Sequence, residues 1–235
     1  MATRSETSNP PRRRRGLFGK IVRWFLFTVV SLWLAGALTL VALRWVDPPT
    51  TALQTERYIQ AWMHHKPYEK NYRFIPIGQI SPNFQHAVIS AEDARFYLHH
   101  GFDWHAMQLA AEDDLDGARI RGGSTLTQQL VKNLFFGTSR SLLRKGAEAS
   151  LVPVAELVLG KQRILELYLN VVEWGPGIYG ADAASHTYFK TPAKNLSRLQ
   201  SAELASTLPA PLTRRPGHVN HYTTVILRRM AQVGW

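Results

Sequence analysis

The stretch RGGSTLTQQLVKNLFF, residues 121–136, decides the fold more than any other part of the chain. Its two glycines form a flexible turn, and Ser124 stands where the N-cap residue of a helix is expected. Leu126, Leu130 and Leu134 then recur at every fourth position, which places them in one apolar stripe along a helix. The pattern therefore predicts a short amphipathic helix that buries its leucines.

The polar face of this helix is a candidate binding surface. Thr125, Gln129 and Lys132 are spaced so that they share that face. A glycine turn that leads into a helix offers free backbone N–H groups to an anion, and a lysine adds a point charge to a phosphate. An ordinary capped helix with solvent-facing amides explains the same residues equally well, so the segment alone does not decide between the two.

Two segments downstream carry further polar residues in helical patterns. In LLRKGAEA, residues 142–149, Arg144 lies four residues before Glu148, so the two share a helix face. In KQRILELYLNVVEWGPGIYGADAASHTYF, residues 161–189, apolar residues typical of a core are interrupted by Asn170. Taken singly, an ordinary ion pair and a packed helix are the simpler interpretations of these two segments.

The segment upstream, SAEDARFYLHHGFDW at residues 90–104, places two acids after an apolar run. If the helix continues, Phe96 and His99 lie on the same face as Glu92, and Asp93 is adjacent to it. A carboxylate beside an aromatic ring on a buried face has a raised pKa, which suits a general base or acid. The alternative is a solvated acidic pair on an amphipathic helix.

The remainder after the membrane segment also shows mostly helical patterns, and we expect an α-rich domain. The best strand candidate is residues 72–77, and Pro153 is expected to kink a long helix. The expected helices cover about residues 82–99, the segment after Asp103, the segment after Ser124, and residues 142–159, 163–172, 182–189, 198–208 and those after Tyr222.

Near the N-terminus, residues 24–43 read WFLFTVVSLWLAGALTLVAL and contain no charge. Twenty helical residues span about 30 Å, which is the thickness of a membrane's hydrocarbon core. Arg23 and Arg44 flank the segment, and Trp24 and Trp45 stand where interfacial aromatic residues belong. A cleaved signal peptide would be followed by small residues at its cleavage site, which are missing here, so we expect a retained anchor.

Composition excludes several classes of protein. The 235 residues are 45% hydrophobic and 19% charged, which is too apolar for a disordered chain. The absence of cysteine excludes a disulfide scaffold, a thiolate zinc site and a cysteine nucleophile. The net charge is +11, and seven basic residues against Glu6 place about half of it in residues 1–23. Beside an apolar span, this basic tail indicates a cytoplasmic end rather than nucleic-acid binding.

Together these segments resemble the peptidoglycan glycosyltransferase family in its monofunctional, membrane-anchored form. The resemblance covers about residues 65–235, and it rests on the order of the motifs because each motif is weak alone. The motifs are E-D-x-x-F-x-x-H-x-G at residues 92–101, G-G-S-T-x-T-Q-Q-L-x-K-N at 122–133, R-K-x-x-E at 144–148, R-I-L-E-x-Y-L-N at 163–170, G-x-G-x-x-G at 175–180 and A-A-S-x-x-Y-F at 183–189.

The resemblance implies a mainly α, lysozyme-like fold with a large lobe and a small jaw lobe, preceded by one transmembrane helix. The implied organisation is a basic cytoplasmic tail at residues 1–23, a transmembrane helix at 24–43, a linker and jaw entry at 44–64, and a glycosyltransferase domain at 65–235. The resemblance places the chain in the bacterial inner membrane, with a cytoplasmic N-terminus and a periplasmic catalytic domain.

The resemblance also implies the reaction and its residues. The enzyme would polymerise lipid II into β-1,4-linked glycan strands with inversion, releasing undecaprenyl pyrophosphate. Glu92 looks like the general base, and Glu148 looks like the second essential carboxylate. The residues that look like substrate contacts or supports of the base are Asp93, Phe96, His99, Ser124, Thr125, Gln128, Gln129, Lys132, Asn133, Arg144, Lys145 and Asn170.

The implied partners are lipid II, the growing lipid-linked strand, the inner membrane, and proteins of cell division or elongation; nucleic acid is not among them. The sequence requires no cofactor and has no metal-site spacing, although a divalent cation, Mg²⁺ or Mn²⁺, is an option at the pyrophosphate. Two rival functions stay open: a lytic transglycosylase or muramidase-like enzyme that cuts existing cell wall, and a membrane-anchored scaffold without activity.

Overall fold

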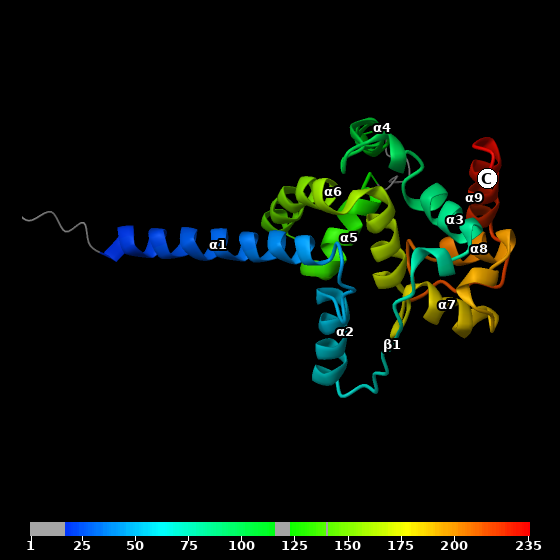
Figure 1. Ribbon diagram of the computed structural model, residues 1–235, viewed down its shortest axis with the longest axis horizontal. Coiled ribbons are helices and arrows are strands. Elements are labelled where there is room, and N and C mark those ends of the chain that lie inside the picture. The colour runs from blue at the N-terminus through cyan, green and yellow to red at the C-terminus, as the bar shows by residue number, and fades with distance from the viewer. Residues whose placement is uncertain (1–16, 116–122, 140) are drawn as a thin grey trace, which may run out of the picture. The chain divides into compact units, whose positions relative to one another are not determined.

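The computed structural model describes residues 17–115, 123–139 and 141–235, and these are mainly helical, as the sequence predicts (Figure 1). The helices are α1 (Leu17–Ala42), α2 (Ala52–Met63), α3 (Pro82–Glu92), α4 (Trp104–Leu115), α5 (Leu126–Phe135), α6 (Leu142–Val171), α7 (Gly180–Phe189), α8 (Arg198–Ala205) and α9 (His221–Gln232). Short 3₁₀ helices cover Ile77–Gln79, Phe96–Leu98 and Ala193–Asn195, and the strands are β1 (Asn71–Tyr72), β2 (Glu173–Gly175) and β3 (Ile178–Tyr179).

Helix α1 is the N-terminal apolar helix. Among the described residues it is the helix long and apolar enough to cross a membrane, from Phe18 to Ala42. It begins at Leu17 rather than at the predicted Trp24, because the residues between them include further apolar side chains around Lys20. The arginine run at residues 12–15 lies outside the described residues.

The chain divides into two compact units, Met1–Ala35 and Gly36–Trp235, and the second unit holds the core. In this core α5 packs along α6. The predicted stripe of Leu126, Leu130 and Leu134 is buried there, and burial of a leucine side chain stabilises a fold by about 1.5–3 kcal/mol. The structure therefore confirms the amphipathic helix.

Helix α6 is interrupted, but not where a kink was predicted. Pro153 lies inside continuous helix, and the non-helical residue is Gly160, with φ 70° and ψ 165°. Only glycine adopts this conformation without strain, since it has no Cβ. The two predicted helices on either side of residue 160 are thus the two arms of α6, and the helix breaks at Gly160 and not at Pro153.

Helix α3 ends at Glu92, well before the predicted end near His99. The backbone leaves the helix at Asp93, where φ is −157°, and the Asp93 carboxylate accepts a hydrogen bond from the backbone N–H of Leu126 on α5. Phe96 therefore belongs to a separate 3₁₀ helix. The predicted common helix face of Glu92, Phe96 and His99 does not exist, because tertiary contact with α5 ends the helix.

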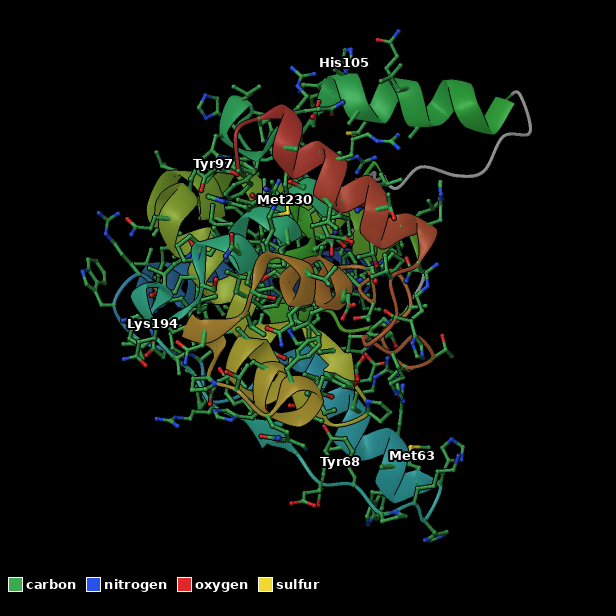
Figure 2. The ribbon with its side chains drawn as sticks, turned by 90° about the vertical axis from the view of Figure 1, so that its right-hand side faces the viewer. Met63, Tyr68, Tyr97, His105, Lys194 and Met230 are labelled. Atoms are coloured by element: carbon green, nitrogen blue, oxygen red, sulfur yellow. The ribbon has the colours of Figure 1, made fainter. Side chains whose placement is uncertain are left out.

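Helices α8 and α9 pack against α3 and hold its last turn in place (Figure 1). Figure 2 shows Met230 of α9 surrounded by other side chains, and this residue is fully buried. The carbonyl groups at the end of a helix lack partners within the helix. Two residues of α9 supply partners: Tyr222 donates from its hydroxyl to Ala91 O at 2.8 Å, and Arg229 donates to Ser90 O at 2.9 Å.

A small three-stranded sheet has the order β1-β3-β2, with β1 parallel and β2 antiparallel to β3. Of the predicted strand at residues 72–77, only Tyr72 is in β1. The β2–β3 hairpin is not among the strands that the sequence predicts. Gly177 makes this turn possible with φ at +73°, and a Cβ there would collide with the backbone oxygen of Glu69.

Candidate active site

Glu92 ends α3 with a carboxylate that is only partly exposed. Gln129 on α5 donates from Nε2 to Glu92 Oε2 at 2.8 Å. Burial raises the pKa of Glu92 above the ordinary 4.5, whereas the hydrogen bond from Gln129 and the positive charge of Lys132 act in the opposite direction. A carboxylate with a raised pKa that still reaches solvent is suited to accept a proton near neutral pH.

Gln129 is itself held by a second protein group. The hydroxyl of Tyr168 on α6 donates to Gln129 Oε1 at 2.9 Å. The ring of Tyr168 is fully buried, and burial raises its pKa well above 10.0. Gln129 was predicted as a substrate contact; the structure shows that both ends of its amide already have partners in the protein.

Asp93 supports the segment that follows Glu92. Its Oδ1 lies 2.9 Å from His99 Nε2, and its Oδ2 accepts from the backbone N–H of Leu126 at 2.9 Å. Because the Gly101 N–H donates to His99 Nδ1 at 3.2 Å, the ring proton is assigned to Nε2, which donates to Asp93. The predicted supports Asp93 and His99 therefore contact each other, and Asp93 ties the end of α3 to the start of α5.

The N-cap of α5 is Thr125 and not the predicted Ser124, which is exposed. The Thr125 hydroxyl accepts from Gln128 N at 3.2 Å, while the Gln128 side chain accepts from Thr125 N at 3.0 Å. The hydroxyl also donates to Gly101 O at 2.6 Å. The polar groups of Thr125 and Gln128 are thus engaged in a capping box that holds α5 in position.

Lys132 is the cation on the predicted polar face of α5. Burial lowers its pKa; the positive charges of Arg144 and Lys145 lower it further, and the negative charges of Glu148 and Glu92 oppose them. No hydrogen bond or ion pair joins the Lys132 ammonium group to another residue in the part of the chain that the structure describes. Its ammonium group is therefore available to a ligand near Glu92.

The first two turns of α6 hold two more cations around a buried acid. Arg144 NH1 and Lys145 Nζ each lie 2.7 Å from one oxygen of Glu148, whose side chain is almost fully buried. The Nε atom of Arg144 is buried, and it has no hydrogen-bond partner among the described residues. The predicted ion pair between Arg144 and Glu148 is therefore present, and Glu148 orients Lys145 as well. The buried Arg144 Nε stays without a partner among the described residues, which is unusual for a buried donor.

Three other predicted residues are packed into the protein. Phe96 is fully buried, and the Lys161 Nζ lies 4.5 Å from the centre of its ring. Asn133 is buried on α5. Asn170 binds the backbone of Ile75 with both ends of its amide, at 2.9 Å each. Asn170 therefore joins α6 to the segment before α3, and its amide is not directed at the group around Glu92.

The predicted option of Mg²⁺ or Mn²⁺ at the pyrophosphate does not fit the cationic group. Both oxygens of Glu148 are occupied by cations, and such ions prefer free carboxylate oxygens. Asp93, His99 and Asp103 form a buried group whose spacing could hold a metal. However, His99 Nε2 donates to Asp93, and Asp103 accepts from the backbone N–H of Ala106 at 3.0 Å, so these atoms are already paired in a hydrogen-bond network.

Sequence reasoning missed three residues that shape the site. Tyr168 was assigned to the core, and Tyr222 and Arg229 were not singled out. A signal for Tyr168 exists in the sequence, because a tyrosine hydroxyl within an otherwise apolar run needs a partner when buried. The contacts of Tyr222 and Arg229 with α3 join residues more than 130 positions apart, so no local pattern reveals them.

Comparison with known proteins identifies the family. The Transglycosylase family model matches residues 57–232. A biosynthetic peptidoglycan transglycosylase of Pseudomonas putida is 44% identical over 209 residues, covering 86% of this chain and 89% of that protein. The protein of the same name from Xanthomonas campestris is 39% identical over 232 residues, covering 97% and 93%. The transglycosylase domain is lysozyme-like, in keeping with the mainly helical fold. The chain therefore belongs to the transglycosylase family, and it is a peptidoglycan glycosyltransferase that builds glycan strands in cell wall synthesis.

Proposed function

We propose that this enzyme polymerises lipid II, with Glu92 as the general base and Lys132, Arg144 and Lys145 as the pyrophosphate-binding cations. The observation that carries the proposal is that Lys132 interacts electrostatically both with Glu92 and with the group of Arg144, Lys145 and Glu148. A proton acceptor and a cationic group thus adjoin each other, as transfer from a pyrophosphate donor requires.

The proposed reaction is a single displacement. The 4-hydroxyl group of the acceptor sugar loses its proton to Glu92, and its oxygen forms a bond to the anomeric carbon of the donor. The bond from that carbon to the pyrophosphate oxygen breaks, and the lipid pyrophosphate leaves with the bonding electron pair. Attack opposite the leaving group inverts the anomeric centre, so an α-linked donor yields a β-1,4 link.

The cationic group acts on the leaving group. Negative charge grows on the pyrophosphate as the bond breaks, and preorganised positive charge stabilises that transition state. The buried Nε of Arg144, which has no partner among the described residues, is a further donor for a phosphate oxygen. In this account Glu148 keeps Arg144 and Lys145 in place, because both of its oxygens are occupied by them.

The rival reaction is cleavage of glycan strands in the existing cell wall, and the products distinguish this cleavage from polymerisation. Purified full-length protein incubated with labelled lipid II should give a lipid-linked polymer that a muramidase degrades. It should release no soluble fragments from isolated cell wall. Soluble fragments from cell wall, together with unchanged lipid II, would establish the lytic alternative instead.

The apolar helix α1 is consistent with a single-pass membrane anchor. We further propose that the N-terminus is cytoplasmic and the catalytic domain periplasmic, because the basic residues precede the span. This orientation brings the site to the lipid-linked substrate on the outer face of the membrane.

The orientation is directly testable because the chain has no cysteine. In intact spheroplasts, a membrane-impermeant maleimide should label the full-length variant Thr50→Cys. It should label Ser5→Cys only after the membrane is permeabilised. The reverse pattern would contradict the proposed topology.

A further inference from the structure

A hydrogen-bonded chain of three side chains leads from the core to Glu92. Tyr168 on α6 donates to Gln129 Oε1 at 2.9 Å, and Gln129 on α5 donates from Nε2 to Glu92 Oε2 at 2.8 Å. Tyr168 has no exposed surface, whereas Glu92 is partly exposed. The chain therefore runs from a closed end to an end that can reach substrate.

The direction of this chain follows from the donors and acceptors that each group has. An amide offers one acceptor end and one donor end, so only one end can donate to the Glu92 carboxylate. If the Gln129 amide were turned round, its oxygen would face the carboxylate oxygen. The Tyr168 hydroxyl would then have to accept from the amide, and its own proton would lose the only acceptor that it has among the described residues.

We infer that Tyr168 is a positioning residue for the transfer reaction: it fixes the direction of the Gln129 amide and so keeps Glu92 in its charged, proton-accepting form. The inference rests on the proposed role of Glu92 as the base. Tyr168 does not touch substrate, but through Gln129 it affects the pKa of Glu92. A residue that only packs in the core would not have this effect.

The other groups near Glu92 do not replace this effect. Asp93 carries a like charge, which raises the pKa of Glu92, and Lys132 on α5 carries the opposite charge, which lowers it. Tyr222 on α9 interacts electrostatically with Glu92. Burial raises the pKa of Tyr222 to about 12, and its hydroxyl donates to the backbone of Ala91 rather than to the carboxylate. Gln129 is thus the group that donates a hydrogen bond to the Glu92 side chain in the described part of the chain.

The test is the pH dependence of kcat/KM on lipid II for the full-length Tyr168→Phe variant. Phenylalanine fills nearly the same space but leaves the amide free to turn. The hydrogen bond from Gln129 to the charged Glu92 carboxylate is then weakened, so the pKa of Glu92 should rise. The acidic limb of the profile, meaning the fall of kcat/KM at low pH, should therefore move to higher pH by about half a unit to one unit, and activity should recover above it. A uniform loss at every pH with an unmoved limb would show a packing role only and overturn the inference.

Two further variants make the result specific. Tyr188→Phe is the matched control, because it removes a tyrosine hydroxyl that donates to Trp174 O at 3.0 Å, and its limb should stay in place. Gln129→Met removes the donor and should move the limb at least as far as Tyr168→Phe does. In the double variant that combines Tyr168→Phe with Gln129→Met, the acidic limb should move no further than in Gln129→Met alone. An additional shift in the double variant, or an unmoved limb in Gln129→Met, would refute the inference that Tyr168 acts on Glu92 through Gln129.

Failure of this inference differs from failure of the proposed base. If Glu92→Gln abolishes turnover while Tyr168→Phe leaves the limb unmoved, Glu92 remains the base and only the role of Tyr168 is lost. If Glu92→Gln stays active, the base assignment itself fails, and the inference fails with it.

Discussion

Replacement of Glu92 by glutamine should lower turnover on lipid II by about 10²–10⁴-fold, which is the usual cost of removing a general base. Glutamine has nearly the same size and can still accept the hydrogen bond that Gln129 donates to Oε2. It cannot take a proton from the acceptor hydroxyl. Turnover is measured with labelled lipid II and full-length protein, and a variant within tenfold of the wild type would remove Glu92 from the mechanism.

The same variant should be more stable than the wild type at neutral pH. The pKa of Glu92 is raised in the fold by burial, so the folded protein binds this proton more tightly than the unfolded chain does. The free energy of unfolding therefore falls as pH rises through the raised pKa, and the charged group costs stability at pH 7. Glu92→Gln should have a higher Tm at pH 7, whereas exposed Glu69→Gln should change neither Tm nor turnover appreciably.

Wild-type activity should fall as the pH drops through the pKa of Glu92, because protonation removes the base. Since burial raises that pKa, the fall should occur above pH 4.5. The limb should be absent from any residual activity of Glu92→Gln.

Replacement of Lys132 by methionine should lower turnover by about tenfold to a hundredfold, since a charge-assisted contact contributes roughly 1.5–3 kcal/mol. Methionine keeps much of the apolar stem and removes the charge. The ammonium group of Lys132 has no hydrogen bond to lose within the described part of the protein, so folding should be little affected. Burial lowers the pKa of Lys132, which means that its buried charge destabilises the folded protein. Removal of that charge should therefore raise the free energy of unfolding.

The matched control for this variant is Lys194→Met. Lys194 is exposed, and Figure 2 shows it at the periphery of the molecule. It has the same charge but lies on the 3₁₀ helix Ala193–Asn195, away from α5 and α6 in the chain. Equal losses in the two variants would indicate a general effect of net charge on lipid II binding, not a site at Lys132.

The fold was predictable wherever a local pattern was strong. The leucine stripe of α5 and the uncharged span of α1 both rest on periodicity or length, and both are present. The end of α3 was not predictable, because Asp93 leaves the helix to bind the Leu126 N–H, 33 residues away. The break in α6 falls between the two helices that the sequence predicts, at residues 142–159 and 163–172, and Gly160 adopts the conformation that makes it possible.

The site was predictable to the extent that its motifs name the residues. Glu92, Lys132, Arg144 and Glu148 were all singled out, and electrostatic interactions connect them in the structure. What the motifs do not reveal is which polar groups the fold itself uses. The Asn170 amide binds the backbone of Ile75, and the Tyr168 hydroxyl donates to Gln129. Both contacts join segments that are far apart in the chain, so no local pattern reveals them.

The central claim is that the proton acceptor and the pyrophosphate-binding cations are separate groups on separate helices. Its most direct test measures the dissociation constant for lipid II and the turnover on the same preparations of Glu92→Gln and Lys132→Met. We expect Glu92→Gln to bind lipid II as the wild type does while losing turnover, and Lys132→Met to lose binding together with turnover. A Glu92→Gln variant that binds as poorly as Lys132→Met, or a Lys132→Met variant with normal binding and turnover, would contradict the account.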